Sequence, residues 1–146
     1  MIEFVKQRIW HQWLIYRLRN KYNKYLRGDQ GSIIDQIKWF FKSQNYFSVK
    51  VDGVIVGSIG FTNILGGRVE FSCITIDYLI VGDLILEKYE LLAKEKGLNI
   101  IMAEIYRNDF KKIKLFRSKG YLVLNETDKS IFYEKKLTTD ELIEII

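Results

Sequence analysis

The sequence predicts a mixed α/β domain in which helices flank a central sheet. Segments rich in β-branched and aromatic residues alternate along the chain with segments whose apolar residues recur with the helical period. The pairs Asp52-Gly53 and Gly66-Gly67 interrupt the middle of the chain, as tight turns between antiparallel strands do. The chain has 146 residues, 48% of them apolar, and no linker-like stretch or repeat, so one domain spanning residues 1–146 is expected.

Two helices are expected before the first strand. The first covers residues 4–19 and is crowded with aromatic side chains. Trp10 and Trp13 lie three positions apart, which is typical of the buried face of a helix. The second helix begins after Ser32, a favoured N-cap residue, and ends near Lys42.

Three strands follow, at residues 46–51, 54–64 and 68–76, and the two glycine turns join them as hairpins. A longer helix is expected next, because its apolar residues share one face and Lys96-Gly97 supplies a helix stop. The apolar residues on that face are Val81, Ile85, Tyr89 and Leu92. The remaining elements are a strand at 99–105, a helix at 109–118, and a strand pair at 121–124 and 130–136.

Residues 100–121 carry the most specific pattern in the chain. An apolar strand is followed by Asn108, a short basic helix ending in Leu115-Phe116, and the tripeptide Lys119-Gly120-Tyr121. This order resembles the C-terminal half of the GNAT superfamily of acyl-CoA N-acyltransferases, and the resemblance covers about residues 15–136. It implies a GNAT-like, mostly antiparallel central sheet flanked by helices. It also implies the transfer of an acetyl group from acetyl-CoA to a primary amine by direct attack.

The resemblance assigns cofactor binding to the passage from the third strand into the long helix. In the family, free amides at the start of that helix bind the pyrophosphate of CoA. The residues that match, together with the Asn of the later motif, are Ile76, Asp77, Gly82, Asp83, Leu84 and Asn108, with Gly82 at the start of the helix. The connection here is shorter than the family's, and Asp83 brings a negative charge to the expected phosphate site. A catalytically degenerate member that keeps the fold for an interaction is therefore a second interpretation.

Catalysis in this family needs a base that takes a proton from the acceptor ammonium. Glu70, at the start of the matching strand, is the candidate base, acting directly or through a water. The tyrosine that usually protonates the leaving thiolate is replaced by Phe116, so Tyr121, Tyr106 or water takes its part. Asn108 is interpreted either as a cofactor ligand or as a plain helix N-cap.

The first third of the chain resembles the GNAT subgroup that acetylates amino groups on nucleotide-linked sugars. The matching segments are Leu18-Arg19-Asn20, Lys38-Trp39-Phe40, Tyr46-Phe47 and residues 56–64. The resemblance implies that Arg19 and Asn20 bind the acceptor, with Arg19 paired to a phosphate. A protein or peptide N-acetyltransferase is the alternative acceptor class.

Charge is distributed unevenly along the chain. Residues 1–50 hold 10 Lys or Arg and 3 acids, whereas residues 51–146 hold 13 and 15. This basic third suits a phosphate-bearing ligand, and it equally suits a solvated helix surface. A nucleic acid is a less favoured partner, because no binding motif occurs and the rest of the chain is slightly acidic.

Other classes of protein are disfavoured by composition. One histidine, His11, and one cysteine, Cys73, without ligand spacing argue against a metal site and exclude an internal disulfide. Both are interpreted as packing residues. No apolar run is long enough for a membrane span or a signal-peptide core, so a reducing, cytoplasmic location and no membrane partner are expected. The oligomeric state, a homodimer included, stays open.

Overall fold

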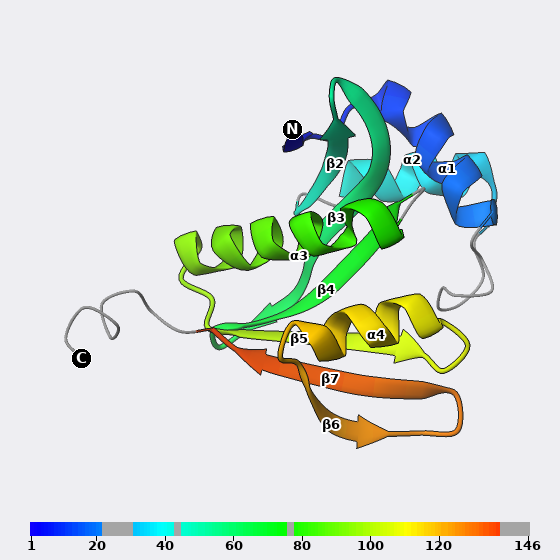
Figure 1. Cartoon of the computed structure of the whole chain (residues 1–146). Helices are drawn as coiled ribbons and strands as arrows, with labels where there is room; N and C mark the ends of the chain where they lie inside the picture. Colours follow the sequence, from blue (N-terminus) through cyan, green and yellow to red (C-terminus); the bar gives the residue numbers. More distant parts are fainter. Residues whose placement is uncertain (22–30, 43–44, 76–77, 138–146) are drawn as a thin grey trace. The chain divides into compact units, whose positions relative to one another are not determined.

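The computed structural model describes residues 1–21, 31–42, 45–75 and 78–137 (Figure 1). Its elements are β1 Ile2–Lys6, the 3-10 turn η1 Ile9–His11, α1 Gln12–Lys21, α2 Ile33–Lys42, β2 Tyr46–Val51, β3 Val54–Leu65, β4 Arg68–Thr75, α3 Tyr78–Glu95, β5 Ile100–Tyr106, α4 Phe110–Ser118, β6 Leu122–Glu126 and β7 Ser130–Lys136. The strands form one seven-stranded sheet in the order β1-β2-β3-β4-β5-β7-β6. β4 and β5 run parallel, while the pairs β1-β2, β2-β3, β5-β7 and β6-β7 are antiparallel. The predicted fold class, a mixed and mostly antiparallel sheet with helices, is confirmed.

The chain divides into two compact units. The first comprises Met1–Gly60 and Ser72–Tyr78, and the second comprises Phe61–Phe71 and Leu79–Ile146. β3 and β4 thus contribute residues to both units. No helix among the described residues is both long and apolar enough to cross a membrane.

The start of the chain is a strand, and the helix predicted for residues 4–19 is wrong there. β1 pairs antiparallel with β2, with Phe4 opposite Val49. The amino group of Met1 lies 2.6 Å from the Asp52 carboxylate and ties the end of the chain to the β2-β3 turn. Helix α1 begins only at Gln12. Strand pairing with a partner more than forty residues away thus outweighs the local helical period, which resumes after η1.

The later start of α1 also changes which face of the helix is buried. Gln12, Ile15 and Leu18 face inwards, three positions apart. Trp13 lies one position outside this stripe and is 58% exposed, and Trp10 in η1 is 71% exposed. The expectation that the two tryptophans are core residues is therefore wrong.

The predicted turns and the cap of α2 are confirmed. Ser32 and Asp35 exchange hydrogen bonds, because Asp35 N donates to Ser32 Oγ at 3.2 Å and Ser32 N donates to Asp35 Oδ2 at 3.0 Å. The hairpin between β2 and β3 turns at Asp52 and Gly53, whose φ angles are +48° and +83°. Gly66 and Gly67 turn β3 into β4 with φ angles of +57° and +80°. Both pairs suit the left-handed conformations that two-residue hairpin turns require.

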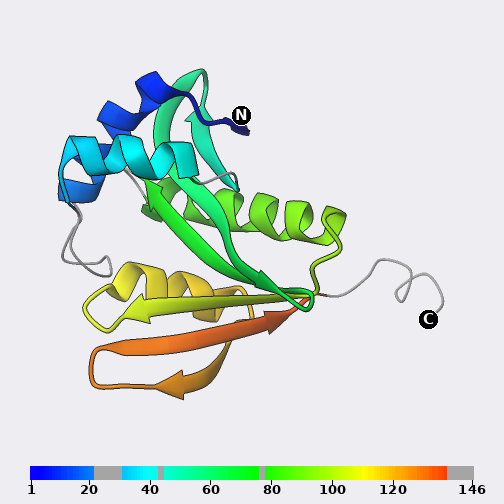
Figure 2. The ribbon, with the colours of Figure 1, turned by 180° about the vertical axis from the view of Figure 1, so that it is seen from behind.

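In the second unit, α4 lies over β5 (Figures 1 and 2), and Tyr89 of α3 packs on Phe61 of β3 and Phe71 of β4. Phe116 of α4 is fully buried and packs against three rings from different elements, with centroid distances of 4.7–6.1 Å. These rings belong to Phe71, Tyr121 and Tyr133. Ile101, Ala103 and Ile105 of β5 complete the floor of this core, so the alternate residues of β5 lie on the other face of the sheet.

Candidate functional site

Glu70 lies on the face of β4 that points away from α3 and α4. Its neighbours Val69 and Phe71 are buried on the helix side, and side chains alternate along a strand. The backbone at Glu70 is held from two directions: its carbonyl accepts the Thr62 hydroxyl of β3 at 2.8 Å and the Tyr89 hydroxyl of α3 at 3.4 Å. In the second unit, Glu70 stands opposite Met102 in the parallel pairing of β4 with β5.

The carboxylate of Glu70 is half-buried and accepts a hydrogen bond from Asn63 Nδ2 at 2.5 Å. Asn63 lies on β3 with φ +50°, a left-handed conformation that asparagine adopts more readily than most residues. A carboxylate has about four lone-pair positions, and the Asn63 amide orients the carboxylate by occupying one of them. This geometry suits a general base.

Arg68 lies two residues before Glu70 on the same face. Its guanidinium pairs with the Glu134 carboxylate of β7 at 2.8 Å and contacts Met102 Sδ at 3.3 Å. The ion pair with Glu134 offsets the positive charge of Arg68 beside Glu70. It also fixes the position of the Arg68 side chain.

Tyr121 is not placed to donate a proton beside Glu70. Its side chain is 3% exposed, and its hydroxyl donates to Glu90 Oε2 of α3 at 3.1 Å. Burial, and then the charge of Glu90, raise the pKa of the Tyr121 phenol. The Glu70 carboxylate is on the opposite face of the sheet, so the structure does not bring the two candidate catalytic groups together. The helix-side packing of Tyr121, which the sequence pattern did not predict, is the reason.

The expectation that Gly82 begins the long helix is wrong, because α3 begins at Tyr78. The amides of Gly82, Asp83 and Leu84 therefore lie within the helix, and the amides without an intrahelical acceptor are those of residues 78–81. Gly82 is buried, whereas Asp83 and Leu84 are exposed. Ile76 and Asp77 lie outside the described residues.

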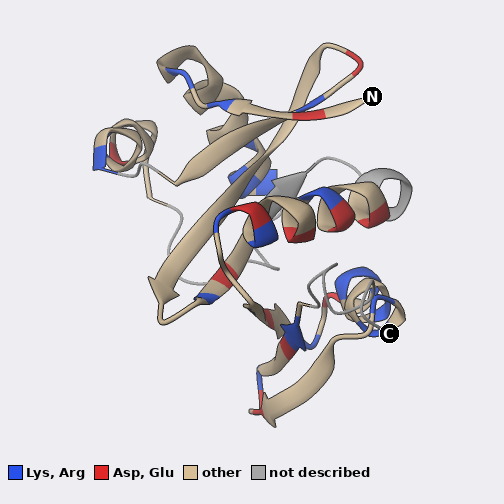
Figure 3. Ribbon diagram, turned by 90° about the vertical axis from the view of Figure 1, so that its left-hand side faces the viewer, with Lys and Arg blue, Asp and Glu red and all other residues tan. Residues whose placement is uncertain are grey.

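The negative charge of Asp83 is partly offset by Lys119, which follows α4. The Lys119 ammonium lies 3.8 Å from Asp83 Oδ1 and 2.7 Å from Glu87 Oε1. The hydrogen bond to Glu87 is the main cause that raises the pKa of Lys119, whose side chain is partly exposed. Acidic residues along α3 and basic residues on α4 give the two helices complementary charge (Figure 3).

Asn108 is exposed in the turn between β5 and α4, and it is not the N-cap of α4. That position belongs to the buried Asp109, whose Oδ1 accepts from Lys112 N at 3.3 Å. The interpretation of Asn108 as a plain cap is therefore wrong, and its assignment to the cofactor stays a prediction.

In the first unit, residues from several of the segments that resemble the amino-sugar subgroup lie close together, namely Arg19, Trp39, Tyr46 and Gly60. Arg19 is half-buried on α1, and its NH1 group donates to Gln36 Oε1 of α2 at 2.9 Å. Burial lowers the pKa of Arg19, and the nearby Tyr46 phenol acts in the opposite sense. The Tyr46 ring packs edge-on against Trp39 at 4.3 Å and covers Gly60, where any side chain would overlap the ring.

Asn20 follows Arg19 on α1, and His11 ends the η1 turn. Asn20 is exposed in the last turn of α1. His11 Nδ1 accepts from Arg8 N at 3.2 Å and lies 2.8 Å from Ser48 Oγ. Burial, followed by the charges of Lys50 and Arg8, lowers the pKa of His11. These contacts fit the predicted packing role of the histidine.

Solved structures share the fold that the sequence alone suggested. No family model and no curated protein matches the sequence. The acetyltransferase of the GNAT family from Bacillus anthracis matches with a TM-score of 0.78, covering 92% of this chain and 94% of its own at 13% identity. The chain has the GNAT fold.

Two further structures with this fold contain the expected cosubstrate. The Campylobacter jejuni N-acetyltransferase PseH, in complex with acetyl coenzyme A, has a TM-score of 0.73 at 19% identity and covers 94% of this chain and 100% of its own. YncA from Salmonella typhimurium, with its cofactor acetyl-CoA, has a TM-score of 0.73 at 14% identity and covers 95% of each chain.

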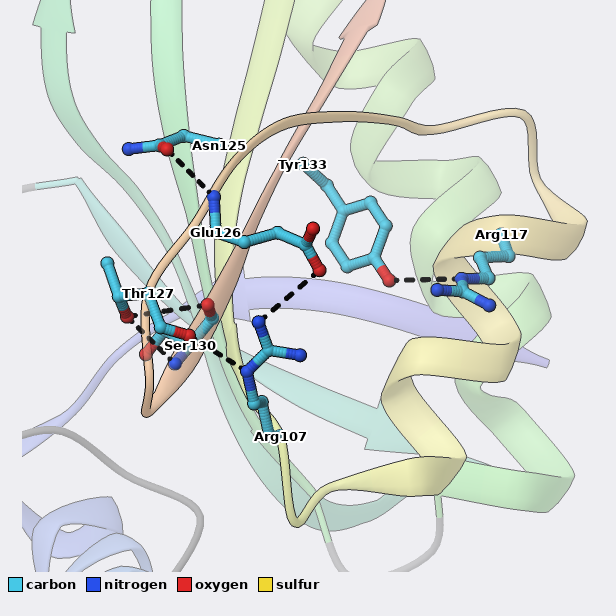
Figure 4. Close-up of polar contacts among 7 residues, drawn as sticks. All are labelled: Arg107, Arg117, Asn125, Glu126, Thr127, Ser130 and Tyr133. Atoms are coloured by element: carbon cyan, nitrogen blue, oxygen red, sulfur yellow. Dashed lines mark hydrogen bonds and ion pairs between the residues drawn. The ribbon is translucent and has the colours of Figure 1, made fainter.

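Sequence reasoning missed the residue that anchors the β5-α4 turn of this GNAT fold. Arg107 Nε donates to the Thr127 carbonyl at 2.8 Å and its NH2 group pairs with Glu126 at 3.3 Å, as Figure 4 shows. Its backbone N–H also donates to the Lys129 carbonyl at 2.9 Å. These contacts fasten the turn that carries Asn108 to the β6-β7 hairpin. Only its place directly before Asn108 distinguished Arg107 in the sequence.

Proposed function

We propose that the protein is an acyl-CoA-dependent N-acetyltransferase that moves an acetyl group from acetyl-CoA to a primary amine. The GNAT fold supports this proposal, and so does the presence of acetyl-CoA in the PseH and YncA structures. The observation that carries it for this chain is the half-buried Glu70 carboxylate, oriented by Asn63 on a strand held by Thr62 and Tyr89.

In the proposed reaction, Glu70 takes a proton from the acceptor ammonium, directly or through a water. The freed lone pair on nitrogen attacks the thioester carbonyl carbon, so that a C–N bond forms and the C–S bond breaks. The departing thiolate takes up a proton to give free CoA. Water is the proposed donor: Tyr121 is bound to Glu90, and Tyr106 lies about 13 Å along β5 from the residue opposite Glu70.

We propose that the cosubstrate phosphates bind at the start of α3. There, residues 78–81 carry the amides that lack an intrahelical acceptor, and Ile76 and Asp77 are the preceding residues in the sequence. Gly82, Asp83 and Leu84 belong to the next turn of the helix. The ammonium of Lys119 partly offsets the negative charge of Asp83 there. Asn108, at the start of the β5-α4 turn, is proposed to bind the pantetheine arm.

The proposed acceptor is an amino group on a nucleotide-linked sugar. Arg19 and Asn20 lie near the end of α1 in the basic third of the chain, and Arg19 is held next to Tyr46 and Gln36. A guanidinium suits the two phosphates of such an acceptor, because it donates in a planar fork.

The test begins with calorimetric titration of the protein with acetyl-CoA and CoA. Saturable binding is expected, followed by release of CoA in the presence of a nucleotide-linked amino sugar. Free amino sugars and peptide N-termini serve as competing acceptors. Binding of neither acetyl-CoA nor CoA would contradict every enzymatic version of the proposal and would favour an interaction protein with the GNAT fold. Equal turnover of peptides would contradict only the acceptor assignment.

A further inference from the structure

A line of buried amide side chains runs through the first unit and ends on Arg19. Gln36 Nε2 donates to Gln12 Oε1 at 2.8 Å, and Gln12 Nε2 donates to Gln7 Oε1 at 3.3 Å. Gln7 Nε2 in turn donates to Ser58 Oγ at 2.5 Å. The exposed fractions of the three glutamines are 1%, 1% and 6% in this order, so the line is shielded from solvent. We name it the glutamine chain.

Arg19 at one end, and the backbone carbonyls of Arg8 and Phe47 along the line, set the direction of the hydrogen bonds in the glutamine chain. A guanidinium can only donate, so Gln36 must present its oxygen to Arg19 and its amino group to Gln12. Gln12 and Gln7 are then forced into the same orientation. Ser58 can end the chain because a hydroxyl accepts as readily as it donates.

The glutamine chain also connects Arg19 to strands β2 and β3 of the first unit. Gln12 Nε2 donates to the Arg8 carbonyl at 3.1 Å, and Gln7 Nε2 donates to the Phe47 carbonyl of β2 at 3.3 Å. Strands β2 and β3 therefore hold, through three side chains, a guanidinium on α1. Buried polar side chains seldom stabilise a core more than apolar residues of the same volume, so stability alone does not account for three glutamines in one line.

Gln36 is a partner that orients a cation without adding a negative charge. A glutamate at this position would have the same shape and would contribute a carboxylate next to the guanidinium. An amide leaves more of the positive potential of Arg19 for a ligand. Tyr46 and Trp39 line the same neighbourhood with aromatic surface.

We propose that the glutamine chain positions Arg19 to bind the anionic part of the acceptor, with Gln7, Gln12 and Gln36 as positioning residues. This inference rests on the proposed function, which assigns Arg19 to the acceptor. It adds that acceptor affinity depends on residues that never touch the acceptor, and that the neutrality of Gln36 is required.

The first experiment tests the neutrality of Gln36 with Gln36→Glu. The Michaelis constant for the nucleotide-linked amino sugar should rise about tenfold or more and lose most of its salt dependence, while that for acetyl-CoA stays unchanged. Lys42→Gln is the matched control, because it changes the charge of α2 by the same amount at an exposed position. An equal rise in both variants would overturn the proposal, since the effect would then be general electrostatics.

The second experiment breaks the chain without touching Arg19. Gln12→Met keeps the volume and removes the donor and the acceptor in the middle of the line. The Nη1–H protons of Arg19, the group that donates to Gln36, should then exchange with solvent about tenfold faster or more when followed by NMR. The Michaelis constant for the acceptor should rise in this variant, but not when the same change is made in an Arg19→Ala background.

The two readouts separate the possible failures. Unchanged exchange at Arg19 would refute the positioning role, whatever the kinetics. Faster exchange with unchanged Michaelis constants for every amine would refute the acceptor assignment in the proposed function, and this proposal with it. A fall in Tm with unchanged exchange and unchanged Michaelis constants would reduce the glutamine chain to a structural feature and would also overturn the proposal.

Discussion

Replacing Tyr121 with phenylalanine separates the structural role of its hydroxyl from the catalytic role that the sequence suggested. The ring, which packs on Phe116 at 4.7 Å, is retained, and only the hydrogen bond to Glu90 is lost. A hydrogen bond to a charged group contributes about 1.5–3 kcal/mol. Glu90 keeps its ion pair with Lys135 at 2.9 Å, so we expect the lower end of this range.

The expected loss of about 1.5 kcal/mol corresponds to a fall in Tm of about 3–6 °C for a chain of this size. Urea unfolding and acetyl-transfer rates measured on the same preparation provide the assay. We expect kcat within about twofold of the parent, because the hydroxyl does not face Glu70.

The raised pKa of the Tyr121 phenol adds an alkaline signature. The folded state keeps this proton above the pH at which the unfolded chain loses it, so parent stability should fall as pH rises above about 10. Tyr121→Phe should weaken that fall. A drop in kcat of a hundredfold with an unchanged Tm would refute the reasoning and restore Tyr121 as an acid.

The remaining predictions concern three charged groups. Asp83→Asn should tighten CoA binding about twofold to threefold at low salt and leave it unchanged at high salt, as measured by calorimetry, because the carboxylate is exposed near the proposed phosphate site. The lowered pKa of His11 means that parent stability falls as pH drops below about 6.5; urea unfolding of His11→Asn should lack this dependence. Arg107→Ala should cost about 1 kcal/mol in urea unfolding, because its partners Thr127 and Glu126 are partly exposed.

Local signals in the sequence predicted the features that depend on neighbouring residues. The Ser32–Asp35 cap, the Asp52-Gly53 turn and the Gly66-Gly67 turn are confirmed, because each is determined within four residues. β1 could not be predicted in the same way, since it depends on pairing with β2. The burial of Trp13 was predicted wrongly as a consequence. The buried face of α1 is formed by Gln12, Ile15 and Leu18, and Trp13 lies outside it.

In the candidate site, too, the sequence indicates the position of a residue along its element but not the partners that reach it from other elements. The position of Glu70 on its strand follows from the motif, but its partner Asn63 reaches it across the β3-β4 turn through a left-handed residue that no pattern marks. The partner of Arg19, Gln36, lies on another helix and has no charge to suggest a pairing. The packing of Tyr121 against Phe116 and its hydrogen bond to Glu90 could not be predicted, because the sequence does not reveal which face of the sheet its ring occupies.

The measurement that tests the central claim most directly is the turnover of Glu70→Gln with acetyl-CoA and the best amine acceptor. Glutamine keeps an oxygen that can accept from Asn63, so the local structure should persist. We expect a fall in kcat of about 10²–10⁴, with CoA affinity and Tm little changed. Turnover equal to that of the parent between pH 6 and pH 9 would contradict it and exclude Glu70 as the base.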